Sequence, residues 1–161
     1  MFDALSLTSK GMPPRVYVTA QDGSYSLVGS SWKRVTQTTD TFGSIILTAP
    51  STTDEPTAVK VNFEAPEQGL YEVAIYSPTV LNASSSAAIS VQHEYGVDAA
   101  GVKQREFSRW HVIGDYYFEK GMNTAALTIK PSINEQGKVI VFNALRFSKY
   151  PYCGNAPGQV C

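Results

Sequence analysis

The chain has 161 residues, of which 43% are hydrophobic and 11% are aromatic. This is enough apolar material for one domain with its own core, and too much for a disordered chain. Lys and Arg number 13 against 14 Asp and Glu, so no net charge favours nucleic acid or an anionic membrane as a partner. No apolar run reaches the roughly 18 residues that a membrane-spanning helix needs.

The first segment, residues 1–14, ends in Pro13 and Pro14 and is expected to be an irregular leader. It lacks the basic region followed by an apolar stretch that marks a signal peptide. From Arg15 onward, β-branched and aromatic runs alternate with turn residues, and no window repeats apolar residues at the helical period. We therefore expect one domain over residues 15–149 that is built of strands, with helix minor.

Alternating apolar and polar residues define several of these strands. In residues 59–64, Val59, Val61 and Phe63 face one way and the polar residues between them face the other, as in a half-buried antiparallel strand. Residues 65–69 form a turn and 70–76 the next strand, while residues 87–95 and 124–129 show the same alternation. Residues 138–147 are apolar on both faces and are expected to form one central strand. Roughly eight to ten short strands predict an all-β fold, an antiparallel β-sandwich of jelly-roll type.

Five motifs follow one another along this pattern. They are Gly29-Ser-Ser-Trp32, residues 57–63, Gly69-Leu-Tyr-Glu-Val-Ala-Ile-Tyr76, Trp110-x-x-x-Gly114 with Phe118-x-x-Gly121, and residues 139–147. Together they resemble the golvesin-like module found at the C-terminus of xanthan lyases and related secreted bacterial proteins. The resemblance implies a fold like that of carbohydrate-binding modules, attachment to polysaccharide or cell wall, and an extracellular or cell-surface location. The chain departs from the family at Asn143, where Asp is common, and in the tail at residues 150–161.

Candidate ligand contacts are the side chains that suit a sugar surface. Flat aromatic rings pack on sugar C–H groups at small entropic cost, and planar polar groups bind hydroxyls. The candidates are Trp32, Arg109, Tyr116 and Tyr117, and the two tyrosines must face opposite ways if they lie on one strand. Trp110 is expected to pack at the edge of the sandwich.

Catalytic and metal-binding motifs do not stand out. The sequence has no Gly-x-Ser-x-Gly elbow, no P-loop and no His-Glu-x-x-His, so we expect neither an enzyme nor a cofactor. A structural calcium is a lesser alternative, with Asp54, Glu55 and Asp98 as loop acids, although no closely spaced run of oxygen ligands occurs.

The two cysteines, Cys153 and Cys161, both lie in the C-terminal tail. A disulfide across this short Gly- and Pro-containing loop is their simplest use and would indicate an oxidising compartment, with free thiols as the alternative.

The sequence therefore predicts a non-catalytic carbohydrate-binding or cell-surface attachment module of a secreted protein, with a polysaccharide or glycan as its partner. The alternative is a structural or assembly module, which would present sheet edges or an apolar patch to another protein or to its own copies.

Overall fold

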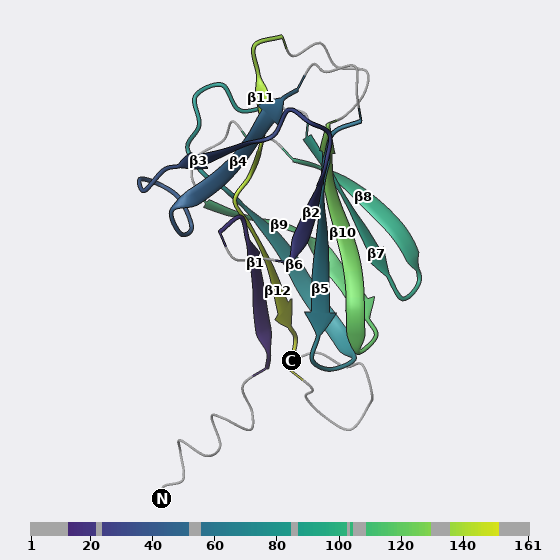
Figure 1. Ribbon diagram of the computed structural model, residues 1–161. Coiled ribbons are helices and arrows are strands. Elements are labelled where there is room, and N and C mark those ends of the chain that lie inside the picture. Colours follow the sequence, from purple (N-terminus) through teal and green to yellow (C-terminus); the bar gives the residue numbers. More distant parts are fainter. Residues whose placement is uncertain are drawn as a thin grey trace, which may run out of the picture.

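The computed structural model describes residues 13–21, 24–51, 56–84, 87–102, 104, 109–129 and 136–151. No residue within these ranges is helical, and they contain 12 strands (Figure 1). The strands are β1 (Arg15–Thr19), β2 (Tyr25–Val28), β3 (Lys33–Thr36), β4 (Ile45–Pro50), β5 (Ala58–Ala65), β6 (Gly69–Ser77), β7 (Ala87–His93), β8 (Gly96–Val102), β9 (Arg109–Phe118), β10 (Gly121–Ile129), β11 (Val139–Phe142) and β12 (Ala144–Lys149). The predicted leader and tail stay predictions, because residues 1–12 and 152–161 lie outside the described part.

The strands form three sheets with antiparallel pairing throughout. One has the order β1-β12-β6-β9, the second β2-β5-β10-β7-β8, and a small third sheet has the order β11-β4-β3. The two larger sheets lie face to face, and the small sheet covers one end of the sandwich (Figure 1). The predicted antiparallel β-sandwich is confirmed. Among the described residues there is no helix that is long and apolar enough to cross a membrane.

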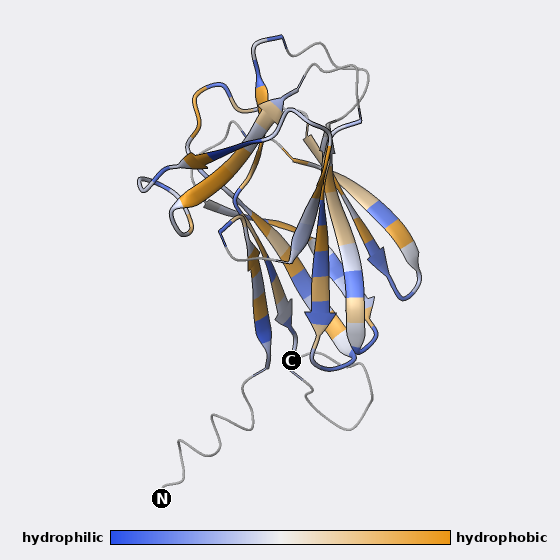
Figure 2. Cartoon of the chain, viewed as in Figure 1, coloured by the Kyte–Doolittle hydropathy of each residue, from blue (hydrophilic) through white to orange (hydrophobic). Residues whose placement is uncertain are grey.

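Side-chain alternation places the core between the two large sheets. Along β5, Val59, Val61 and Phe63 are at most 1% exposed and belong to the main core. The polar residues between them point outward, which appears as bands of contrasting colour along β5 in Figure 2. The strand ends at Ala65 and β6 begins at Gly69, so the predicted turn is confirmed as well.

Four aromatic rings occupy the centre of this core. Phe63 and Phe147 stack with ring centroids 4.0 Å apart and planes 4° from parallel, which brings β5 of one sheet against β12 of the other. Tyr71 and Phe118 meet the Phe63 ring edge-on at 5.3 Å. Offset and edge-to-face contacts of this kind add to the stabilisation from apolar burial, so these rings hold the two sheets together.

The prediction of one central strand over residues 138–147 is wrong in one respect. The structure divides it at Asn143 into β11, which pairs with β4, and β12, which pairs with β6 and β1. The apolar character on both faces has a simple origin: Ile140 and Phe142 enter the main core, while Val141 joins a second, smaller cluster.

A buried phenol makes the fold sensitive to alkali. Burial raises the pKa of Tyr71 above its ordinary value of 10.0, and the Glu67 carboxylate raises it further. The unfolded chain therefore loses this proton first, so stability is intact below about pH 10 and falls as the pH rises through the folded-state pKa. We expect the urea midpoint to drop between about pH 8 and about pH 11, and to drop less in Tyr71→Phe. An equal drop in both proteins would contradict this assignment.

Candidate functional site

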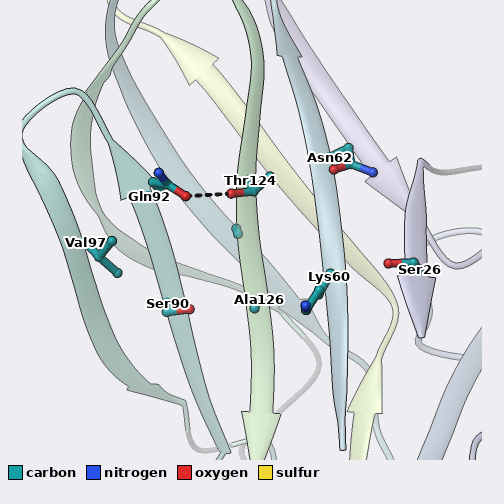
Figure 3. A pocket seen from close by; sticks show the side chains of 9 residues that line it. Ser26, Lys60, Asn62, Ser90, Gln92, Val97, Thr124 and Ala126 are labelled. Carbon is teal, nitrogen blue, oxygen red and sulfur yellow. Dashed lines mark hydrogen bonds between the residues drawn. The ribbon is translucent and has the colours of Figure 1, made fainter. Parts of the chain in front are cut away.

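A polar groove runs across the outer face of the five-stranded sheet (Figure 3). Because alternate side chains of a strand point to opposite faces, the residues between the core positions of β5, β7 and β10 gather on this surface. The lining residues are Ser26, Lys60, Asn62, Ser90, Gln92, Val97, Thr124, Ala125 and Ala126.

The strand register explains why the surface is hollow. On β10, Ala126 lies directly between Lys60 of β5 and Ser90 of β7. A methyl group and a small hydroxymethyl group leave space there, whereas the longer Lys60 and Gln92 side chains stand around it. The resulting hollow has a volume of about 330 Å³, and a second hollow of about 300 Å³ adjoins it beyond Gln92 and Thr124.

Most polar groups in the first hollow have no partner among the residues that the structure describes. The Thr124 hydroxyl donates to the Gln92 side-chain oxygen at 3.2 Å. The side chains of Ser26, Lys60 and Asn62 make no hydrogen bond or ion pair to any described residue, and neither does Ser90. The hollow therefore offers hydroxyl, amide and ammonium groups that can all bind an oxygen-rich ligand.

Charge is distributed unevenly along the groove. Among the described residues, Lys60 is the one charged side chain that lines the first hollow, whereas Glu94 and Glu119 line the second hollow beside His93. Neither a carboxylate nor an aromatic ring of the described part lines the first hollow. The site is thus suited to polar contacts from a sheet surface, and differs from the ring platform that the sequence suggested.

The predicted ligand residue Trp32 lies between β2 and β3, away from the groove lining. Its ring packs against the main core and its indole N–H donates to the Val28 carbonyl oxygen at 3.0 Å. Arg109 is the first residue of β9, where it pairs with Ser77, and its side chain lies outside the described part. Their roles as ligand contacts stay predictions.

Tyr116 and Tyr117 occupy opposite faces of β9. Tyr116 packs against the core, and Tyr117 meets the exposed Tyr95 ring edge-on at 5.8 Å. Neither lines the groove, so Trp32, Tyr116 and Tyr117 do not meet in its lining, and the predicted ligand set stays a prediction.

The surroundings of Tyr116 give the Trp-x-x-x-Gly motif a packing explanation. The Tyr116 ring lies over Gly114, where an added Cβ would come within 2.8 Å of the Tyr116 hydroxyl oxygen. The centroid of the Tyr116 ring lies 5.1 Å from that of the His93 ring, and His93 Nε2 is 2.9 Å from an Asp98 carboxylate oxygen. Burial raises the pKa of Tyr116, and the nearby carboxylates of Asp98 and Asp115 raise it further. These groups therefore form a packed edge of the sandwich in which the phenol stays neutral.

A cluster of aromatic rings lies on the opposite side of the molecule, on the outer face of the four-stranded sheet. Trp110 contacts Tyr17, Phe42 and Tyr76 at centroid distances of 5.9, 5.3 and 5.2 Å. The guanidinium of Arg146 lies 4.6 Å above the Trp110 ring, a distance at which a cation is attracted to the ring face. We call these five residues the aromatic face. Tyr17 is its most open ring, 41% exposed.

The remaining site predictions fall partly outside the described residues. Cys153, Cys161, Asp54 and Glu55 all lie there. Within the ranges that are described, no three His, Cys, Asp or Glu side chains gather as a metal site, and the loop acid Asp98 is paired with His93.

The fold is shared with solved carbohydrate-binding modules. A CBM35 from Cellvibrio japonicus Abf62 matches 89% of this chain and 99% of its own length with a TM-score of 0.57 at 13% identity. A family 35 carbohydrate-binding module from Clostridium thermocellum matches 83% of this chain and 98% of its own with a TM-score of 0.58 at 17% identity. The sandwich is therefore the fold of these carbohydrate-binding modules.

The chain belongs to the Golvesin C-terminal domain family, which it matches over residues 16–149. The xanthan lyase of Bacillus sp. strain GL1 is 25% identical over 135 residues, covering 83% of this chain and 14% of the relative. The structure of Paenibacillus xanthan lyase matches with a TM-score of 0.77 at 22% identity, covering 88% of this chain and 13% of that one. The chain thus spans only a small part of the length of these relatives.

Proposed function

We propose that this protein is a non-catalytic carbohydrate-binding module that holds a glycan in the groove of the five-stranded sheet. The observation that carries the proposal is the hollow of about 330 Å³, in which the side chains of Ser26, Lys60, Asn62 and Ser90 have no partner among the described residues. Sugars present many hydroxyl groups that both donate and accept, and such side chains complement them. The fold shared with carbohydrate-binding modules supports the same function.

The lining of the first hollow also supports binding over hydrolysis at that position. Glycoside hydrolysis in most families uses a pair of carboxyl groups on either side of the scissile bond. No Asp or Glu of the described part lines the first hollow. A ligand held there would meet hydrogen-bonding groups without a carboxyl pair to cleave it.

The module is proposed to act as part of a larger extracellular protein. It corresponds to a small part of the xanthan lyases that it resembles, so we infer that it keeps its parent protein on a polysaccharide or at a cell surface. A binding site on a rigid sheet suits this task, because little ordering is needed when the ligand docks.

Filling the hollow tests the proposal. Ala126→Leu places a larger side chain on the groove floor between Lys60 and Ser90. We expect it to weaken binding by about tenfold or more in affinity electrophoresis against a polysaccharide panel that includes xanthan. Val112→Leu is the matched control, because Val112 is 59% exposed on the other sheet; it should leave binding unchanged.

Two further results separate the competing sites. Thermal unfolding must show that Ala126→Leu remains folded. If binding survives in Ala126→Leu and is lost in Tyr17→Ala, the glycan lies on the aromatic face and the groove assignment is wrong. No binding to any polysaccharide by the native protein would contradict the function itself.

A second candidate function is assembly through the aromatic face. Tyr17 and Val112 are exposed residues of the four-stranded sheet, whose outer face carries this cluster. Exposed apolar surface of this kind marks many protein interfaces. Concentration-dependent mass in light scattering that disappears in Val112→Lys, together with indifference to glycans, would favour assembly over glycan binding.

A further inference from the structure

The positive charge of Lys60 bears on which charge the bound glycan should have. Lys60 points outward from β5 and is exposed, and it forms no ion pair with any described residue. Its neighbours across the sheet are Ser26 on β2 and Ala126 on β10, both uncharged. A positive charge therefore stands at the hollow without a counter-charge from any residue that the structure describes.

The other described charges on this face of the sheet do not neutralise Lys60. The outward positions of β7, β8 and β10 around the hollow carry Ser90, Gln92, Val97, Thr124 and Ala126, all of them uncharged. The carboxylate of the same strand, Glu64, lies four residues along β5, roughly 13 Å away at the usual rise of an antiparallel strand. At that distance, beyond the screening length of physiological salt, Glu64 has little effect on the potential at the hollow.

We propose that the groove selects glycans that carry an anionic group on a sugar unit, a carboxylate or a sulfate, and that this group binds the Lys60 ammonium. This rests on the proposed function of the groove. An anionic group there gains a charge-assisted hydrogen bond from Lys60, with the Ser26 hydroxyl on the neighbouring strand as a second donor. The uncharged remainder of the sugar lies over Ala126 and Ser90.

The second hollow restricts where further anionic groups can lie along the glycan. Glu94 and Glu119 line it, and a second anionic group placed there would be repelled. The glycan that fits both hollows therefore has its acidic unit followed by neutral units towards Gln92 and Thr124. A polymer with an acid on every unit, such as polygalacturonate, fits less well than one with spaced acids.

Matched polymers test this selectivity. The probes are xanthan and carboxyl-reduced xanthan, with carrageenan and desulfated carrageenan as the sulfate pair, measured by isothermal titration against the native protein. We expect the anionic member of at least one pair to bind about tenfold more tightly than its neutral counterpart, with affinity falling as salt rises. The pair that responds identifies carboxylate or sulfate as the recognised group.

Lysine variants then show whether Lys60 causes the preference. Lys60→Gln should lose the preference for the anionic polymer and flatten the salt dependence, whereas Lys60→Arg should keep the preference and the salt dependence. The control is Lys33→Gln, at an exposed lysine on β3, which should leave the preference and the salt dependence unchanged. Equal binding of both members of each pair overturns the inference and leaves the proposed function standing. Binding to neither member of either pair also overturns the inference, and the function itself fails only if no polysaccharide of the wider panel binds. A preference that persists in Lys60→Gln overturns the assignment to Lys60.

Discussion

Asn143→Asp is expected to destabilise the fold by about 3–5 kcal/mol at neutral pH, because it places a buried negative charge opposite backbone carbonyl oxygens. Asn143 is fully buried. Its side-chain NH₂ group donates to the carbonyl oxygens of Phe42 and Ile45 at 2.9 and 3.1 Å. Its side-chain oxygen accepts from the Phe42 N–H at 2.8 Å. A carboxylate keeps only the last of these bonds and faces two carbonyl oxygens that it repels.

The penalty should depend on pH in a defined direction. The introduced carboxyl is disfavoured in its charged form, so its folded-state pKa lies above the ordinary value near 3.9. A group with a raised folded-state pKa gives full stability below its unfolded pKa and loses it as the pH rises through the folded pKa. Asn143→Asp should therefore approach the native protein in stability below about pH 4 and fall behind it towards neutrality.

Urea unfolding at about pH 4 and about pH 7 measures this effect. Asn143→Ala is the control: it removes the same hydrogen bonds without adding charge, and should cost about 2–3 kcal/mol at both pH values. Equal stability of Asn143→Asp and the native protein at neutral pH would contradict the prediction. That result would mean that the loop at Phe42 turns donors towards the carboxylate.

The same residue shows where the sequence is informative about the fold and where it is not. Alternation in β5 and the turn before β6 are local patterns, and both were predicted. The break between β11 and β12 depends on contacts of Asn143 with a loop about 100 positions earlier in the chain. Nothing in the sequence near Asn143 indicates these contacts. Gln104 is similar, because its buried amide binds both the N–H and the carbonyl oxygen of Val141.

The groove was harder to predict than the fold. Outward Ser, Asn, Gln and Thr residues in β5, β7 and β10 could have indicated a polar face, but such residues also cover ordinary solvent-facing sheets. The hollow forms because the strand register places Ala126 between Lys60 and Ser90. This register depends on which strands pair, and the sequence alone does not show that. The aromatic rings were conspicuous in the sequence, and the structure uses Trp32 and Tyr116 in packing.

Phe63→Ala is expected to lower the free energy of unfolding by about 3–5 kcal/mol. The Phe63 ring is 1% exposed and contacts Phe147, Tyr71 and Phe118. Removing it leaves a cavity between the sheets and abolishes the stacked and edge-on contacts together. Phe63→Leu fills more of the space and should cost less, and the difference between the two variants in urea unfolding measures the contribution of the filled volume.

The same variant separates stability from recognition. Phe63 faces the core from β5, the strand that presents Lys60 and Asn62 to the groove. Hydrogen bonding to β2 on one side and β10 on the other holds this strand in register, so Phe63→Ala should bind glycan normally at temperatures where it remains folded. Lys60→Gln should show the reverse, with unchanged unfolding and altered binding. Loss of binding in folded Phe63→Ala would mean that core packing sets the shape of the groove, because the pairing of β5 alone would then be insufficient to position its outward side chains.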